Sequence, residues 1–129
     1  YTISCMAASE KVAIFEDDSR YQRFLIRELE TAGHYSQVVA SSAGQIPNGV
    51  KRATEEGFSV IISDGNLSSD VTGKDGDKII GEIKKINPRI VLIGYSSEGK
   101  IRGTMKDFEK GVSLPREVVE FITNLPLRP

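Results

Sequence analysis

The chain has 129 residues, of which 39% are hydrophobic and 27% charged, so it suits one globular domain with a single hydrophobic core. Its 17 basic and 18 acidic residues give a formal net charge of -1 without any run of lysine and arginine, so the charge balance gives no basis for direct binding of nucleic acid. Cys5 is the only cysteine and no apolar run approaches the roughly 20 residues of a transmembrane helix, which excludes an intramolecular disulfide, a cysteine metal cluster and a membrane span, and we expect a cytoplasmic protein.

The start of the chain lacks the charged-then-apolar pattern of a secretion signal. We expect residues 1–9 to be a disordered or non-native lead and residues 10–126 to form the domain. Residues 12–15 predict a strand, which runs directly into three acidic residues.

A helix is predicted after these acids, with Asp18 or Ser19 as its N-cap and Gly33 at its C-terminal end. Its apolar stripe consists of Tyr21, Phe24, Leu25, Leu29 and Ala32. A short strand follows over residues 38–40. The next helix is expected to begin late, over residues 49–56, because Pro47 and Gly49 would disturb a helix interior.

The second half of the chain continues the alternation. Residues 58–63 contain a buried strand, and a polar loop over residues 67–77 leads into a helix that stops before Pro88. That helix carries Ile79, Ile80, Ile83 and Ile86. Residues 90–93 predict a fourth strand and Phe108 lies on a brief fifth. The last helix has Ser113 as a cap and Pro115 in its first turn, and its buried face consists of Val118, Phe121, Ile122 and Leu125.

Strands that alternate with helices, and that are almost continuously apolar, favour a parallel sheet covered on both faces. Right-handed crossovers then give a doubly wound α/β sheet. Ligands of such sheets bind beyond the carboxyl ends of the strands, so the residues that follow each apolar run are the candidates for function.

Carboxylates follow two of these runs. Asp17 and Asp18 come after the first strand and Asp64 ends the third, so we expect all three at one edge of the sheet. Two carboxylates about 4 Å apart repel by roughly 4 kcal/mol at an effective dielectric constant near 20. A hard cation such as Mg²⁺ would neutralise the cluster. The alternative is that Asp17 and Asp18 only cap the first helix.

A hydroxyl and an amine are expected at the same edge. Ser96 follows the fourth strand and Lys110 precedes the last helix. Fixed donors around a carboxylate and a metal ion stabilise the charge that develops in phosphoryl transfer. Taken singly, Ser96 reads as a loop serine and Lys110 as a solvated lysine. The combination therefore points to phosphoryl transfer chemistry.

From about Glu10 to Leu125 the chain resembles the receiver domains of two-component response regulators. The matching segments are residues 12–18, 60–67, 75–76 and 90–97. The resemblance implies a flavodoxin-like sheet of five parallel strands in the order 2-1-3-4-5, with residues 10–126 as the receiver domain.

The resemblance also implies the roles of the site residues. Asp64 would accept a phosphoryl group from a sensor histidine kinase or a phosphotransfer protein, and Lys110 would pair with that group. Mg²⁺ would be held by Asp18, Asp64 and the backbone carbonyl of Asn66, with one water oriented by Asp17. Ser96 and Phe108 would be the switch residues.

The chain departs from the family pattern in several places. The loop over residues 68–74 is longer than usual and lacks a proline. Only fourteen positions separate Ser96 from Lys110, so we expect a short, irregular or missing fourth helix. Gly111 replaces the usual proline after the lysine, Phe108 lies one place too close to it, and Lys106 is a rival for its role.

Two other functions compete with the phosphoacceptor switch. A pseudo-receiver would keep the fold as a protein-interaction module that phosphorylation does not control, and the shortened region after Ser96 favours it. A Mg²⁺-dependent phosphohydrolase would need a second acid two residues after Asp64, where the sequence has Asn66.

Overall fold

The computed structural model describes residues 9–67 and 74–126. Within them, five parallel strands form one sheet in the order β2-β1-β3-β4-β5. The strands are β1 (Lys11–Phe15), β2 (Tyr35–Ala40), β3 (Val60–Ser63), β4 (Val91–Ser96) and β5 (Lys106–Glu109). The helices are α1 (Ser19–Thr31), α2 (Ile46–Glu55), α3 (Asp75–Ile86) and α4 (Pro115–Thr123), with a 3₁₀ turn, η2 (Ala43–Gln45), before α2. The doubly wound, flavodoxin-like α/β class and the strand order are therefore confirmed.

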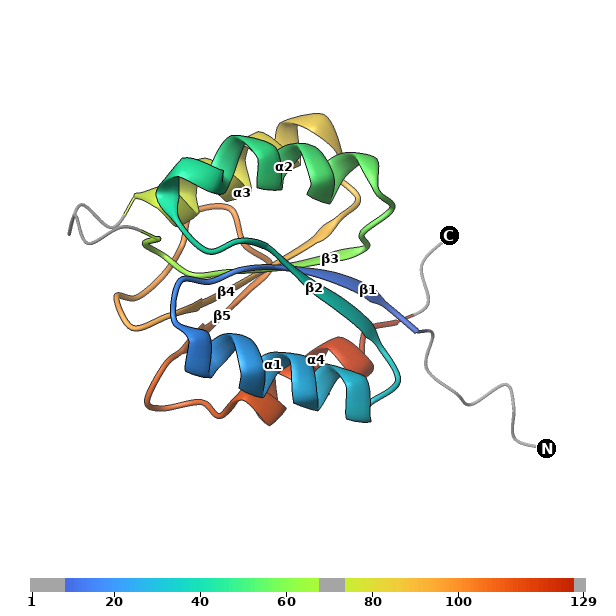
Figure 1. Ribbon diagram of the computed structural model, residues 1–129. Helices are drawn as coiled ribbons and strands as arrows, with labels where there is room; N and C mark the ends of the chain where they lie inside the picture. Colours follow the sequence, from blue (N-terminus) through green and yellow to red (C-terminus); the bar gives the residue numbers. More distant parts are fainter. Residues whose placement is uncertain (1–8, 68–73, 127–129) are drawn as a thin grey trace.

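Helices cover both faces of the sheet, with α2 and α3 on one side and α1 and α4 on the other (Figure 1). Alternate side chains of β1 enter different cores, since Ala13 and Phe15 pack in the core of α2 and α3, whereas Val12 and Ile14 pack in the core of α1 and α4. All four of these residues are fully buried. Burial on both faces explains why the central strands read as continuous apolar runs.

Helix α1 begins and ends where the sequence predicts. The Asp18 carboxylate accepts a hydrogen bond from the backbone of Arg20 at 2.8 Å, and Gly33 follows the helix with a φ of 86°. Leu25 and Leu29 are buried as expected. Phe24 is 46% exposed, so its place in the predicted buried stripe is wrong.

Helix α2 starts three residues earlier than predicted. Pro47 lies in its first turn, where the missing N–H costs no hydrogen bond. Gly49 is buried against β1 and β2, and a Cβ there would lie 2.9 Å from Cε2 of Phe15. Pro47 therefore fits this helix because of its position, and Gly49 because of its close packing. Helix propensity alone takes neither into account.

Other boundaries also move. Strand β2 begins at Tyr35, ahead of the predicted residues 38–40, and α4 is capped at Leu114 instead of Ser113. Of the four isoleucines of α3, Ile79, Ile80 and Ile83 are fully buried, whereas Ile86 is 60% exposed. Two predicted segments fall largely outside the described residues. These are the lead over residues 1–9, of which only Ser9 is described, and the long loop over residues 68–74, of which only Lys74 is described.

His34, the only histidine, lies in the connection between α1 and β2 and is buried. Its Nδ1 accepts a hydrogen bond from the backbone N–H of Glu10 at 3.0 Å, and its Nε2 lies 3.0 Å from the Thr123 hydroxyl. Since Nδ1 accepts, the ring is neutral with its proton on Nε2. The histidine thus ties the start of β1 to the end of α4.

The segment between β4 and β5, residues 97–105, consists of turns and contains no helix, as the short spacing predicts. Asp107 holds it, because its carboxylate accepts hydrogen bonds from the backbone of Ile101 at 3.2 Å and from the Thr104 hydroxyl at 2.9 Å. The backbone N–H of Arg102 donates to Asp77 of α3 at 2.8 Å. The connection between β4 and β5, where a helix would be usual, is thus a loop tied to β5 and α3.

In the part of the chain that the structure describes, no helix combines the length and the apolar character that crossing a membrane requires.

Candidate functional site

The carboxyl ends of β1 and β3 are adjacent, because Phe15 pairs with Ser63 in the parallel register. The backbone N–H of Asp64 donates to the carbonyl of Phe15 at 2.8 Å. The residues directly after the two strands, Glu16 and Asp64, are therefore neighbours.

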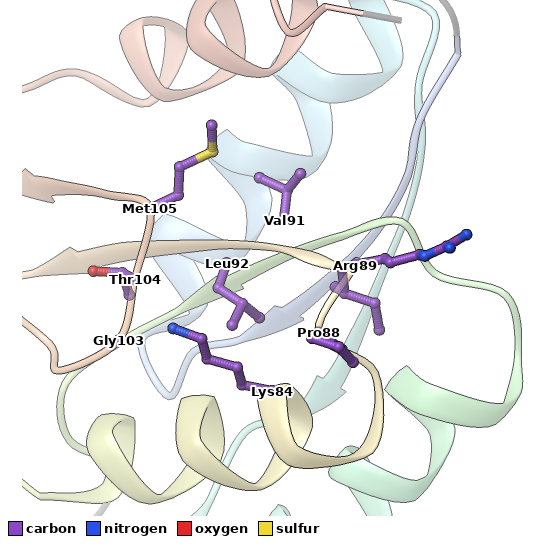
Figure 2. Close-up of a pocket in the computed structure, with 9 residues that line it drawn as sticks. Lys84, Pro88, Arg89, Val91, Leu92, Gly103, Thr104 and Met105 are labelled. Atoms are coloured by element: carbon purple, nitrogen blue, oxygen red, sulfur yellow. The ribbon is translucent and has the colours of Figure 1, made fainter. Parts of the chain in front are cut away.

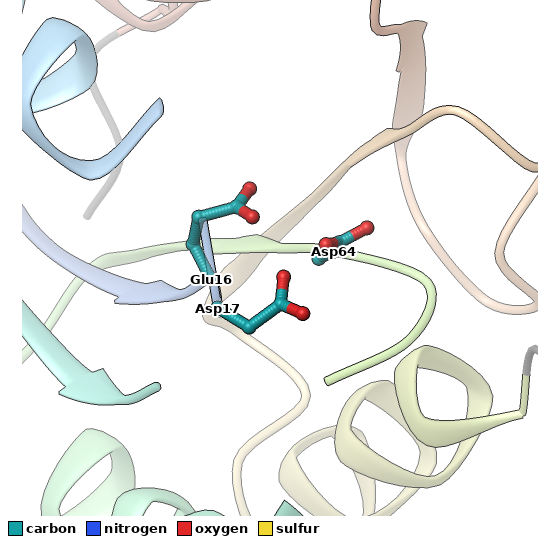
Figure 3. Close-up of side chains that lie close together, drawn as sticks. All are labelled: Glu16, Asp17 and Asp64. Carbon is teal, nitrogen blue, oxygen red and sulfur yellow. The ribbon is translucent and has the colours of Figure 1, made fainter. Parts of the chain in front are cut away.

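Three carboxylates gather at this edge. Glu16, Asp17 and Asp64 each offer an oxygen atom, and these atoms lie within 4.8 Å of one another. Figure 3 shows the side chains of Glu16 and Asp17 directed towards Asp64. Glu16 is 1% and Asp64 8% exposed, so water screens their charges poorly.

Lys110 supplies the one ammonium group that contacts this cluster among the described residues. Its Nζ lies 2.7 Å from Oε1 of Glu16 and 3.0 Å from Oδ2 of Asp64, and only 9% of its side chain is exposed. The same Nζ lies 4.5 Å from the centroid of the Tyr21 ring. Lys106, the rival candidate, lies over Phe108 instead, so the structure places Lys110 and not Lys106 at the cluster.

The electrostatics of the cluster follow from burial and proximity. Burial, and then the charge of Asp64, raises the pKa of Glu16 from its ordinary 4.5 to about 8, even though Lys110 opposes the shift. Burial, followed by Asp64, also raises the pKa of Asp17. Burial alone would lower the pKa of Lys110, but Glu16 and Asp64 outweigh it and raise that pKa. The cluster thus carries more negative charge than one lysine can offset.

Asp18 lies outside this group of three. It caps α1, and its Oδ2 lies 2.9 Å from a guanidinium nitrogen of Arg20. The Arg20 side chain and backbone hold the pKa of Asp18 at about 2. The sequence predicts that Asp17 and Asp18 meet Asp64. In the structure Glu16 and Asp17 meet it instead, one residue earlier in the chain.

Sequence reasoning missed Glu16 and Tyr21. A usable signal for Glu16 was present, because aligning the ends of the two predicted strands, residues 15 and 63, places it opposite Asp64. Tyr21 carried no such signal, since its position in the apolar stripe of α1 fits a core residue equally well.

Ser96, at the end of β4, is 2% exposed, and its Oγ accepts a hydrogen bond from the backbone of Glu98 at 3.1 Å. It packs against Gly65, where a Cβ would lie 2.6 Å from Ser96 Oγ. Its carbonyl accepts a hydrogen bond from the Lys110 backbone at 3.0 Å. Ser96 therefore lies directly beside the backbone that follows Asp64, and a small residue at position 65 is required.

A pocket of about 540 Å³ opens over the cluster. Its lining residues are Asp17, Asp18, Arg20, Tyr21, Asp64, Asn66, Ser97, Glu98, Lys110 and Gly111. Asn66 and Ser97 therefore line the pocket, whereas the buried Ser96 is not among its lining residues. Phe108 is partly buried and packs against the core of α1 and α4, with its ring centroid 5.8 Å from that of Phe121.

Known structures share this fold. A CheY-like response regulator receiver domain protein from Methanospirillum hungatei is similar with a TM-score of 0.73 at 20% identity, over 89% of this chain and 91% of that one. The non-phosphorylated HemR receiver domain from Leptospira biflexa gives 0.73 at 16% identity, over 94% and 98%. The Mn(2+)-bound form of response regulator Rcp1 gives 0.68 at 16% identity, over 93% and 99%. No protein-family model and no curated protein matches the sequence.

These similarities confirm the resemblance to receiver domains at the level of the fold. The cluster itself fits a divalent metal ion, because it offers three carboxylates within 4.8 Å of one another and a surplus of negative charge. The site thus combines oxygen donors for a hard cation with a fixed ammonium group.

Proposed function

We propose that the chain is a phosphoacceptor switch, in which Asp64 takes up a phosphoryl group within a two-component signalling system. The observation that carries the proposal is the position of Lys110, whose Nζ lies between the carboxylates of Glu16 and Asp64. A phosphoryl group that arrives at Asp64 would meet a cation already in contact with the acceptor.

In the proposed reaction, a carboxylate oxygen of Asp64 forms a bond to the phosphorus of a phosphohistidine on a sensor histidine kinase or a phosphotransfer protein. The bond between phosphorus and the imidazole nitrogen breaks, and that nitrogen keeps the electron pair and takes up a proton. Lys110 then pairs with the phosphoryl oxygens as a compact point charge. Ser96 donates its hydroxyl to them after it leaves the backbone of Glu98. No catalysis beyond this self-catalysed transfer and autodephosphorylation is proposed.

The proposal includes Mg²⁺. Asp17, Asp64 and the backbone carbonyl of Asn66 would hold the ion, and Asp18 on the pocket wall is a further candidate ligand. When bound, the ion offsets the repulsion between Asp64 and the incoming phosphoryl oxygens. Support comes from the acidic cluster and from the Mn(2+)-bound form of a response regulator with this fold.

The test is the intact mass after incubation with Mg²⁺ and acetyl phosphate. We expect the wild-type protein to gain the mass of one phosphoryl group and Asp64→Asn to gain none. Glu82→Gln, which removes an exposed carboxylate of α3 outside the cluster, is the matched control and should behave as the wild type does. An equal gain in Asp64→Asn, or no gain in the wild type, would contradict the proposal.

The tethered segment over residues 97–105 favours one alternative, a pseudo-receiver that binds its partner without phosphorylation. Asp107 and Asp77 hold this segment, so movement of Ser96 meets resistance from the chain that follows it. A folded wild-type protein that takes up no phosphoryl group in the mass experiment would support this alternative.

A further inference from the structure

Two adjoining pockets flank the segment over residues 97–105, and they share Thr104 and Met105. One, of about 310 Å³, lies where β4 extends beyond β5, since β5 pairs only with residues 93–96. The other, of about 720 Å³, lies between this segment, β5 and Asp77 of α3. We call the two together the Met105 groove.

The smaller pocket has apolar walls from both sides of the sheet edge. Val91 belongs to the core of α1 and α4 and Leu92 to the core of α2 and α3, and both reach this pocket. In Figure 2, Met105 lies above the strand and the Lys84 side chain extends from α3 towards Gly103 and Thr104. Met105 is 62% exposed, which is unusual for a large apolar side chain beside two core residues.

The charges around the Met105 groove are strongly one-sided. Its lining contains five cationic residues and two acidic ones, although the whole chain has 17 basic and 18 acidic residues. The cations are Lys84, Arg89, Lys100, Arg102 and Lys106. Among the described residues, none of the five forms a salt bridge.

The two acids of the Met105 groove are already engaged. Asp77 accepts the backbone N–H of Arg102, and Asp107 accepts the backbone N–H of Ile101 and the Thr104 hydroxyl. They hold the segment in place, and with five cations against two acids the lining still carries a net positive charge. The groove therefore presents positive charge around an exposed apolar side chain.

We propose that the Met105 groove binds an acidic segment of a partner protein that carries large apolar side chains. An apolar side chain of the partner would cover Met105 and enter the smaller pocket, and flanking carboxylates would pair with Lys84 and the neighbouring cations. Apolar anchors inside a charged rim are the usual source of affinity and orientation in such contacts. A nucleic acid would use the cations but leave Met105 exposed, so a protein segment is the better match.

This surface lies outside the carboxylate cluster and does not depend on phosphorylation of Asp64. The probe is a phage-displayed library of random peptides, selected on the full chain, and the enriched peptides are then titrated against labelled protein by NMR. We expect acidic residues that flank large apolar ones, and shift changes at residues 84, 89 and 103–105. Asp64→Asn should bind these peptides as the wild type does.

Matched variants locate the contact. Lys84→Glu and Met105→Ser should each weaken binding about tenfold or more, which corresponds to about 1.4 kcal/mol. Lys85→Glu makes the same charge change one residue away, and Ile86→Ser removes a side chain that is 60% exposed; neither residue lines the Met105 groove, and both variants should bind normally.

Several outcomes would overturn the proposal: no enrichment of acidic and apolar peptides, shift changes elsewhere, or equal losses in the control variants. Tighter binding of single-stranded DNA than of any peptide would make the surface a nucleic-acid site. A dimer that Met105→Ser abolishes would make the occupant a second copy of the chain.

Discussion

The Nζ atom of Lys110 lies closer to Oε1 of Glu16, at 2.7 Å, than to Oδ2 of Asp64, at 3.0 Å. The lysine is therefore not reserved for Asp64 but shared with a buried glutamate at the end of the neighbouring strand. This sharing links the stability of the domain to the charge state of its site.

Lys110→Met should destabilise the protein. The change leaves Glu16 and Asp64 buried without their cation, and removing one partner of a buried ion pair costs about 3 kcal/mol. Urea unfolding at pH 8 measures the loss. Lys106→Met, which removes an exposed lysine of β5, should change the free energy of unfolding by less than about 0.5 kcal/mol. Equal losses in the two variants would refute the assignment of Lys110 to the cluster.

The stability of the metal-free protein should fall as the pH rises towards 8. The pKa of Glu16 is about 8 in the folded protein and 4.5 ordinarily, so between these values the folded state binds more protons than the unfolded state. The contribution is fully present below pH 4.5 and is lost as the pH rises through 8. Unfolding in EDTA across this range measures the slope, and Glu16→Gln should flatten it. The same slope in the wild type and in Glu16→Gln would contradict the shift.

His34 should produce the opposite dependence at lower pH. Burial lowers its pKa below 6.5, and its Nδ1 must stay unprotonated to accept the backbone N–H of Glu10. The unfolded chain therefore binds the proton more tightly, and stability present above pH 6.5 is lost as the pH falls. NMR titration of the imidazole and unfolding of His34→Gln check this. An imidazole that titrates above 6.5 in the folded protein would disprove it.

Gly49→Ala should destabilise the fold even though alanine favours helices. A Cβ at this position would lie 2.9 Å from Cε2 of Phe15 and 3.1 Å from the carbonyl oxygen of Val39, and such overpacking costs about 1–3 kcal/mol. Gly81→Ala is the matched control, because it lies within α3 with open space around it and should stabilise by up to about 1 kcal/mol. Thermal unfolding of both variants tests the contrast, and a stabilised Gly49→Ala protein would show that α2 can move away from β1.

Asp107→Ala should loosen the segment over residues 97–105 while leaving the sheet intact. The change removes the acceptor of the Ile101 N–H and the Thr104 hydroxyl, which hold this segment against β5. Hydrogen exchange by mass spectrometry should show faster exchange in residues 97–105 and unchanged protection in β1 and β3. Unchanged exchange of the segment would mean that Ile101, which is buried, anchors it alone.

The sequence by itself determined the class of the fold and the general location of the site. Apolar runs of strand length, separated by helical patterns, require a parallel sheet covered on both faces, and Asp64 and Lys110 could be placed at its carboxyl edge for that reason. The fourteen positions from Ser96 to Lys110, compared with the usual spacing of receiver domains, predicted a short, irregular or missing helix, and the structure has none there. These conclusions depend on local patterns and chain length, which the sequence contains directly.

Only the tertiary structure decided which acidic side chains lie together and against which core Phe108 packs. The strand register places Glu16 opposite Asp64, and the helix start turns Asp18 towards Arg20 instead. The register of β4 and β5 packs Phe108 beside Phe121 and leaves Asp107 to hold the neighbouring segment. A shift of one residue along a strand reverses the face of a side chain, so residue types and spacing cannot resolve these contacts before the strands are paired.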